Sequence, residues 1–191
     1  MSVIVAISIF TIPGLAAKVK DPKCADVTEI KQNFTPEYLA VLDGYNSKGK
    51  LLDESYDMNG VLIEANHVKE VCGNSTDKTV ANARTETKTR STKPADSSVV
   101  ALGAAAIDSA NSTSKFNMKN ARCKDFISLR EEVQPIAAYY VAGKENAGKI
   151  KTGDIDEVFL ERPIVQLVQD CTAKPEASFY SRAKTWTKAH L

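Results

Sequence analysis

Four cysteines are the residues of this sequence best suited to chemistry, as metal ligands, as a redox pair or as disulfides. Cys24 and Cys72 are 48 positions apart, and so are Cys123 and Cys171. Zinc sites and redox dithiols usually bring cysteines in close pairs such as CxxC, and no such pair occurs here. We therefore predict the disulfides Cys24–Cys72 and Cys123–Cys171, no metal site and no cofactor.

Other catalytic signals are absent from the sequence. It has no GxSxG, no glycine-rich phosphate loop and no HExxH motif. The two histidines, His67 and His190, are predicted to be solvated or capping residues. The basic residues outside the cysteine-bounded segments are too dispersed to indicate nucleic-acid binding. We predict that the protein is not an enzyme and does not bind nucleic acid.

The residues between the cysteines also repeat. Moving the second half of the chain back by 99 positions aligns identical residues without a gap. These pairs are Asp26 with Asp125, Pro36 with Pro135, Gly44 with Gly143, Gly49 with Gly148, Lys50 with Lys149 and Asp57 with Asp156. The repeat predicts a tandem duplication of one small module. Modules of this size need a covalent link, and each disulfide should stabilise its module by about 4 kcal/mol.

The repeat and the N-terminal residues predict the domain boundaries of the chain. Residues 1–16 are predicted to be a signal peptide, because an apolar run from Val3 to Phe10 precedes a site for cleavage before Ala17. Residues 22–83 form the first module, 84–122 a mostly disordered linker, and 123–191 the second module. The linker contains an apolar stretch at 99–107, either a short helix or the remnant of a second signal peptide. No segment has the length of a membrane span.

Helical periodicity predicts an all-α fold of two small disulfide-linked helical modules in tandem. In the second module a first helix begins near Cys123, with a kink or break at Pro135 and an end at the glycines near 143 and 148. A middle helix leads into Cys171, with Pro163 in its first turn. A third helix runs from Glu176 to the end of the chain.

Motifs in the second module resemble the periplasmic acid-stress chaperones of the HdeA type. They are Cys123-Lys124-Asp125-Phe126, Val133-Gln134-Pro135, Cys171-Thr172, Ala177-Ser178-Phe179 and Lys184-Thr185-Trp186-Thr187-Lys188. The first module keeps Cys24, Asp26, Phe34, Pro36, Gly44 and Cys72 but lacks the Ala-Ser-Phe and Trp motifs. The resemblance implies a disulfide-linked helical protein of the periplasm that loosens in acid and binds unfolding proteins.

The charge balance is compatible with such a response. Residues 24–83 carry ten Asp and Glu against five Lys, a net charge of minus 5, and residues 123–191 carry ten of each sign. Protonation of the carboxylates would leave both modules strongly positive and would weaken their folded structure. The disulfides would keep the loosened chain compact.

The resemblance also suggests a site and partners. The candidate client-binding residues are apolar residues expected to be buried at neutral pH: Phe126, Val133, Ile136, Tyr139, Tyr140, Phe159, Leu160, Ile164 and Val168. The expected partners are unfolded or acid-denatured periplasmic proteins, and the two modules are expected to pair with each other within one chain. The alternative is a periplasmic module that binds a single partner at neutral pH, such as an immunity or inhibitor protein.

Overall fold

A computed structural model describes residues 22–50, 55–91, 115–149, 155 and 157–190 of the 191-residue chain. The predicted signal peptide at 1–16 and the apolar stretch at 99–107 lie outside the described residues. The described chain is all-α apart from one pair of two-residue strands, which confirms the predicted fold class.

The helices of the two halves of the chain can be paired in sequence order. The first half contains α1 (Cys24–Glu29), the 3-10 helix η1 (Gln32–Phe34), α2 (Thr35–Asn46), β1 (Tyr56–Asp57), α3 (Met58–Asn74) and α4 (Val80–Ser91). The second half contains β2 (Lys115–Phe116), α5 (Cys123–Ile127), α6 (Gln134–Asn146), α7 (Glu157–Leu160), α8 (Val165–Ala173) and α9 (Phe179–His190). The pairs are α1 with α5, α2 with α6, α3 with α7 and α8, and α4 with α9. We call residues 22–91 the first half and residues 115–190 the second half below.

Local sequence signals explain where the longer helices begin. Pro36 and Pro135 lie in the first turns of α2 and α6, where a missing backbone donor costs nothing. The side chain of Asp57 accepts a hydrogen bond from the Gly60 amide at 2.8 Å and so caps α3. The helices therefore start at residues that supply a cap or a fixed backbone angle.

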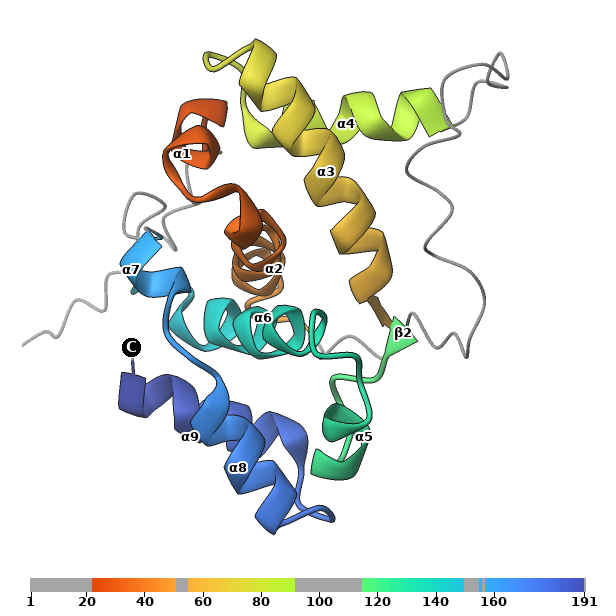
Figure 1. The fold of residues 1–191 in the computed structure, drawn as a ribbon, viewed down its shortest axis with the longest axis vertical. Coiled ribbons are helices and arrows are strands. Elements are labelled where there is room, and N and C mark those ends of the chain that lie inside the picture. Colours follow the sequence, from red (N-terminus) through yellow and green to blue (C-terminus); the bar gives the residue numbers. More distant parts are fainter. Residues whose placement is uncertain (1–21, 51–54, 92–114, 150–154, 156, 191) are drawn as a thin grey trace, which may run out of the picture.

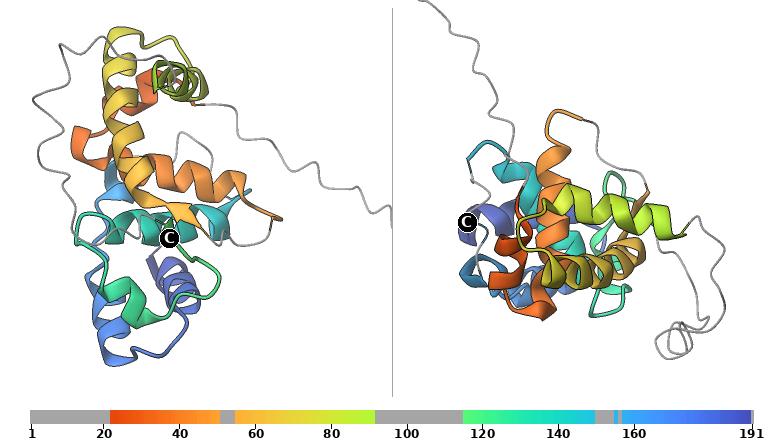
Figure 2. Two further views of the ribbon diagram at one scale, coloured as in Figure 1. Left: turned by 90° about the vertical axis from the view of Figure 1, so that its right-hand side faces the viewer. Right: turned by 90° about the horizontal axis from the view of Figure 1, so that it is seen from above.

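The helices form three layers (Figure 1). α2 and α6 cross at the centre, with α1, α3 and α4 on one side and α5, α8 and α9 on the other. A second view shows the same order of layers (Figure 2). β1 and β2 pair antiparallel, with Tyr56 opposite Phe116 and Asp57 opposite Lys115, so this small sheet also joins the two halves.

Several predicted helix boundaries differ from the structure. The chain breaks between Ile127 and Gln134, so α5 and α6 are separate helices, and the break lies just before Pro135. The predicted middle helix is divided into α7 and α8, with Pro163 between them. The last helix begins at Phe179 and not at Glu176. The apolar periodicity predicted continuous helices across these positions. The structure instead interrupts the helices near Pro135 and Pro163.

The segment predicted as linker is partly helical. α4 continues beyond residue 83 to Ser91, and residues 115–122 carry β2 and a turn. The remainder of that segment, 92–114, lies outside the described residues.

Candidate functional site

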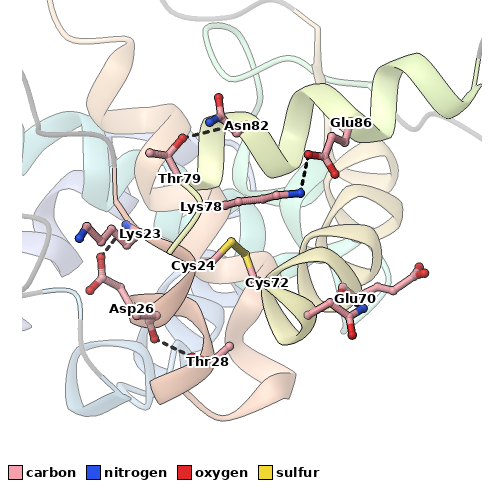
Figure 3. Close-up of a disulfide and its surroundings, with 12 residues drawn as sticks. Lys23, Cys24, Asp26, Thr28, Glu70, Cys72, Lys78, Thr79, Asn82 and Glu86 are labelled. Atoms are coloured by element: carbon pink, nitrogen blue, oxygen red, sulfur yellow. Dashed lines mark hydrogen bonds and ion pairs between the residues drawn. A yellow bond between two sulfur atoms is a disulfide. The ribbon is translucent and has the colours of Figure 1, made fainter. Parts of the chain in front are cut away.

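The two disulfides have the predicted pairing. Cys24 bonds to Cys72 and Cys123 bonds to Cys171, each across 48 positions, so no cysteine remains free. Each bond joins the start of a short helix, α1 or α5, to the end of a longer one, α3 or α8. Figure 3 shows the bond between Cys24 and Cys72 between these two helices, with Lys78 and Glu86 paired nearby. Each half of the chain is therefore closed by its own covalent link.

The backbone around each disulfide is hydrogen-bonded in the same way. The Cys24 amide donates to the Lys78 carbonyl at 2.7 Å, and the Cys123 amide donates to the Ala177 carbonyl at 2.9 Å. The Asp26 and Asp125 carboxylates accept from the amides of the residues three positions before them. Corresponding partners are 99 positions apart in both comparisons. Residues aligned by the sequence repeat thus occupy equivalent places.

The candidate client-binding residues lie in the core. Phe126, Val133, Ile136, Tyr139, Tyr140, Phe159 and Leu160 are buried, and Ile164 and Val168 are partly buried against them. All nine belong to one hydrophobic core cluster of the described residues, seven as members and two packed against it.

Two groups of these residues can be distinguished by their ring contacts. Tyr139 contacts Phe159, with ring centroids 6.0 Å apart, and its hydroxyl lies 2.9 Å from the Leu160 carbonyl oxygen. Phe126 instead stacks on Phe179 with centroids 4.6 Å apart. These residues offer apolar surface only if helices separate.

Two glycines that the repeat pairs lie where the backbones of the two halves come close together. A Cβ on Gly44 would lie 1.9 Å from the Tyr140 carbonyl oxygen, and a Cβ on Gly143 would lie 2.1 Å from the Val41 carbonyl oxygen. Only glycine permits this approach of the two backbones. The prediction that Gly143 helps to end its helix is wrong, because it lies inside α6. Gly148, with φ of 86°, does follow the helix end.

Two lysines hold the C-terminal ends of the central helices. The Lys144 ammonium of α6 donates to the Ser47 carbonyl at 2.6 Å and to the Lys50 carbonyl at 3.0 Å, just beyond α2. The Lys48 ammonium donates to the Ala147 carbonyl at the end of α6. A cation at a helix C-terminus satisfies free carbonyl groups and the helix dipole. Each half therefore caps the central helix of the other.

Carboxylates hold the outer helices of the first half. The Arg84 guanidinium on α4 donates to Asp43 on α2 at 2.8 Å and to Glu64 on α3 at 2.8 Å. Burial alone would lower the pKa of Arg84, but the hydrogen bonds that it donates to the Glu64 and Asp43 carboxylates raise it. The three side chains are only 17 to 23% exposed. Sequence reasoning missed this cluster, since the three residues lie far apart in the chain.

A corresponding contact holds the last helix of the second half. Glu145 on α6 accepts from the Lys184 ammonium at 2.8 Å and from the Tyr180 hydroxyl, both on α9. Burial would raise the pKa of Glu145, but these hydrogen bonds and the nearby lysines lower it. The stabilisation is thus present above the ordinary pKa of a glutamate and is lost as pH falls through the lowered value.

One carboxyl group lies at the central layer without such a partner. The Oε2 atom of Glu37 on α2 is buried and has no hydrogen-bond partner among the described residues. Burial raises the pKa of Glu37 to about 7, although its own backbone amide and Lys69 on α3 partly oppose this. Glu37 also helps to raise the pKa of Tyr139 on α6, after the larger effect of burial.

The histidines have local roles. His67 lies 3.9 Å from Glu70 within α3, and His190 stacks on Trp186 with ring centroids 5.5 Å apart. Within the part of the chain that the structure describes, no group of three potential ligands could hold a metal ion. None of the described helices is long and apolar enough to cross a membrane.

Comparison with known proteins confirms the resemblance stated from the sequence motifs. Residues 95–181 match the model of the HdeA/HdeB family, so the match begins within the predicted linker and ends inside α9. Proteins named probable acid stress chaperone HdeA, from Brucella ovis, Brucella canis and Brucella abortus, are 27% identical over 95 residues. The matched region is 47% of this chain and 83% of each relative. No solved structure gives a significant match.

The relatives that match are named as chaperones and not as enzymes. The two disulfides fit an oxidising compartment. The family match lies over the second half of the chain, and residues 22–91 lie outside it.

Proposed function

We propose that this protein is a periplasmic acid-stress chaperone that loosens at low pH and binds unfolding proteins through apolar surface, preventing their aggregation. The match of residues 95–181 to the HdeA/HdeB family carries this proposal. The relatives bear the name of acid stress chaperones, and the function comes to this chain by that similarity. The predicted signal peptide and the two disulfides support export to the periplasm.

Two features of the fold support acid activation. Apolar side chains of α6 and α7, such as Tyr139 and Phe159, are buried, and Trp186 of α9 packs against Tyr139. Carboxylates hold the outer helices, at Arg84 in the first half and at Glu145 in the second. Protonation in acid removes the charge from these carboxylates, and the disulfides keep each half compact. The predicted client-binding residues are those that this loosening would expose.

The repeat supports an origin by tandem duplication. The disulfides, the hydrogen bonds at Cys24 and Cys123, and the left-handed glycines Gly49 and Gly148 all recur 99 positions apart. In this proposal the two modules, 22–83 and 123–191, pair with each other within one chain.

An acid titration tests the proposed function. The full chain without residues 1–16 is mixed with citrate synthase, and light scattering from the aggregating enzyme is followed from neutral pH to about pH 2. We expect little effect at neutral pH and suppression of scattering in acid, together with binding of an apolar-surface dye. No suppression at any pH, or tight binding of one partner at neutral pH, would favour the single-partner module instead.

A further inference from the structure

Each disulfide lies beside two short segments that hydrogen-bond to each other through their backbones. The start segments, 22–25 and 121–124, contain the first cysteine of each half, and the closing segments, 76–80 and 175–179, follow the second cysteine. The Val80 amide donates to the Pro22 carbonyl at 2.8 Å, and the Phe179 amide donates to the Ala121 carbonyl at 3.0 Å. Such bonds do not depend on side-chain identity. The backbone alone therefore does not determine which start segment bonds to which closing segment.

Four cysteines can pair in three ways, and two of these ways are compatible with the segments. The native pairing joins each start segment to the closing segment of its own half. A swapped pairing, Cys24 with Cys171 and Cys72 with Cys123, also joins each start segment to one closing segment. The third pairing, Cys24 with Cys123 and Cys72 with Cys171, would join the two start segments to each other. It is incompatible with the hydrogen bonds that the structure shows at both disulfides.

The spacing of the cysteines does not favour the native pairing over the first bond of the swapped pairing. Cys72 is 48 positions from Cys24 and 51 positions from Cys123. Loop-closure entropy varies only with the logarithm of loop length, so the two bonds should close within about 1.1-fold of each other. In a chain that is oxidised from the unfolded state, the choice of partner must then come from side-chain packing.

The side chains beside the two disulfides differ in size. Phe126, three residues after Cys123, stacks on Phe179 of the closing segment with ring centroids 4.6 Å apart, and both rings are fully buried. The corresponding residues of the first half are Val27 and Val80, which are also buried. We call Phe126 and Phe179 the large pair, and Val27 and Val80 the small pair. Each half thus combines residues of one size.

The swapped pairing would combine unequal sizes. Val27 would lie beside Phe179 and leave unfilled the space that the Phe126 ring occupies, and such a cavity is destabilising. Phe126 would lie beside Val80, at a position where the first half has a valine, and overpacking is destabilising as well. Both closures of the swapped chain are therefore less stable than the native ones.

Charge does not distinguish the two closing segments in the same way. The Lys124 ammonium of the second start segment lies 2.9 Å from Glu176 of its closing segment. The corresponding residue of the first closing segment is Asp77, which also carries a carboxylate. Lys124 would meet a negative charge in either pairing. Side-chain size is therefore the feature that separates the native pairing from the swapped one.

We propose that the large pair and the small pair determine which cysteines bond when the chain is oxidised. In each oxidation one cysteine thiolate attacks the disulfide of an oxidant, and the second cysteine then displaces the oxidant, which leaves as two thiols. The two cysteines give up two electrons and two protons in all. A free thiolate can also attack a wrong disulfide, so exchange continues until the best-packed pairing accumulates. This inference goes beyond the proposed chaperone function and does not depend on it.

Oxidative refolding of the reduced chain tests this proposal. The full chain without residues 1–16 is reduced and unfolded in denaturant, then diluted at about pH 8 into a mixture of reduced and oxidised glutathione, where thiolates form and disulfides exchange. The reaction is stopped with acid, the chain is digested without reduction, and mass spectrometry measures the three pairings. We expect the native pairing to exceed the swapped pairing by at least about tenfold. Equal amounts of the two would overturn the proposal.

Exchanging one member of each pair should redirect the oxidation. In the variant Val27→Phe with Phe126→Val, it is the swapped pairing that brings residues of equal size together. We expect the ratio of swapped to native pairing to rise by at least about tenfold over that of the unaltered chain. Adding Val80→Phe and Phe179→Val restores equal sizes within each half. This four-residue variant should return the ratio towards that of the unaltered chain, and a ratio that rises further would contradict the proposal.

A matched control exchanges two corresponding residues on the exposed surface. Glu29→Ser with Ser128→Glu alters the last residue of α1 and the residue after α5, and it should leave the ratio unchanged. The third pairing is the internal reference. If the two-residue variant of the large and small pairs gains the swapped and the third pairing alike, it has only lost stability, and the proposal is wrong. The measurement detects covalent bonds, so it also decides the question for a variant that folds incompletely.

Discussion

Glu37 occupies in the first half the place that the fully buried Ile136 occupies in the second, 99 positions later. A carboxyl group therefore lies where the repeat otherwise places an alkyl side chain. Its partnerless Oε2 atom and raised pKa have the same main cause, which is removal from water that its own backbone amide and Lys69 only partly offset.

Replacing Glu37 should change stability in a pH-dependent way. The pKa is raised from 4.5 to about 7, so the folded state binds a proton more readily and the contribution of Glu37 to stability improves as pH falls through this interval. Glu37→Gln should raise the free energy of unfolding by about 2 kcal/mol near neutral pH, with the gain shrinking towards pH 5. Urea denaturation at several pH values measures this.

Glu29→Gln on the exposed surface of α1 is the control, and it should not change the free energy of unfolding at any of these pH values. A gain for Glu37→Gln that is equal at all pH values would show that ionisation of Glu37 is not the cause.

At the scale of helices, the ends of α2 and α6 and their outer faces are held by different chemistry. The ends are capped by lysines from the opposite half, and the outer faces are covered by helices that carboxylates hold in place. Burial lowers the pKa of Lys144, with partial compensation from Glu145, but the ammonium remains charged in acid. The two kinds of contact should therefore respond differently to pH.

Removing a lysine cap should cost the same amount of stability at neutral and at mildly acidic pH. Lys144→Met removes the ammonium donor from the Lys50 carbonyl and leaves the Ser47 carbonyl with the Lys50 amide, and we expect a loss of about 1–2 kcal/mol at both pH values. Lys149→Met, on an exposed residue just beyond α6, is the control. Thermal or urea unfolding of both variants measures the difference, and a loss confined to neutral pH would contradict this account.

Trp186 reports on α9 because it is the only tryptophan of the chain. Its side chain is 4% exposed and packs against Tyr139. Release of α9 would expose it to water and should move its fluorescence emission to longer wavelength. We expect this shift as pH falls from neutral towards about 2, while far-ultraviolet circular dichroism retains most of its helical signal. Emission that stays constant in acid would mean that α9 remains docked.

At the scale of the whole molecule, the first and second halves meet through equivalent surfaces. Gly44 approaches residue 140 and Gly143 approaches residue 41, which are again 99 positions apart. A contact in which each side presents the same patch is the arrangement of a two-fold dimer. Here it is formed within one chain, so a second chain is not needed to cover these faces.

We therefore expect a single-chain species in solution at neutral pH. Light scattering coupled to size-exclusion chromatography should give the mass of one chain, independent of protein concentration. Gly143→Leu supplies the comparison, because it exposes both central faces and should promote association between chains. A stable dimer of the unaltered chain at all concentrations would contradict intramolecular pairing.

The sequence alone determined the covalent and local features of this protein. Cysteine spacing predicted both disulfides, since each pair lies within one copy of the repeat, and helical periodicity predicted the all-α class. The prolines marked helix boundaries, although the apolar pattern ran through Leu129 and concealed the break before α6. These features depend on spacing along the chain, which a sequence displays directly.

Only the tertiary structure decided which residues meet. Asp43, Glu64 and Arg84 converge because α2, α3 and α4 pack together, and no pattern in the sequence links them. The repeat paired Gly44 with Gly143, but their role follows from the crossing of α2 and α6, where backbone approach excludes a Cβ. The burial of Glu37 likewise depends on neighbours supplied by other helices. Charge compensation and close packing are properties of three-dimensional neighbours, so they could not be derived from residue order.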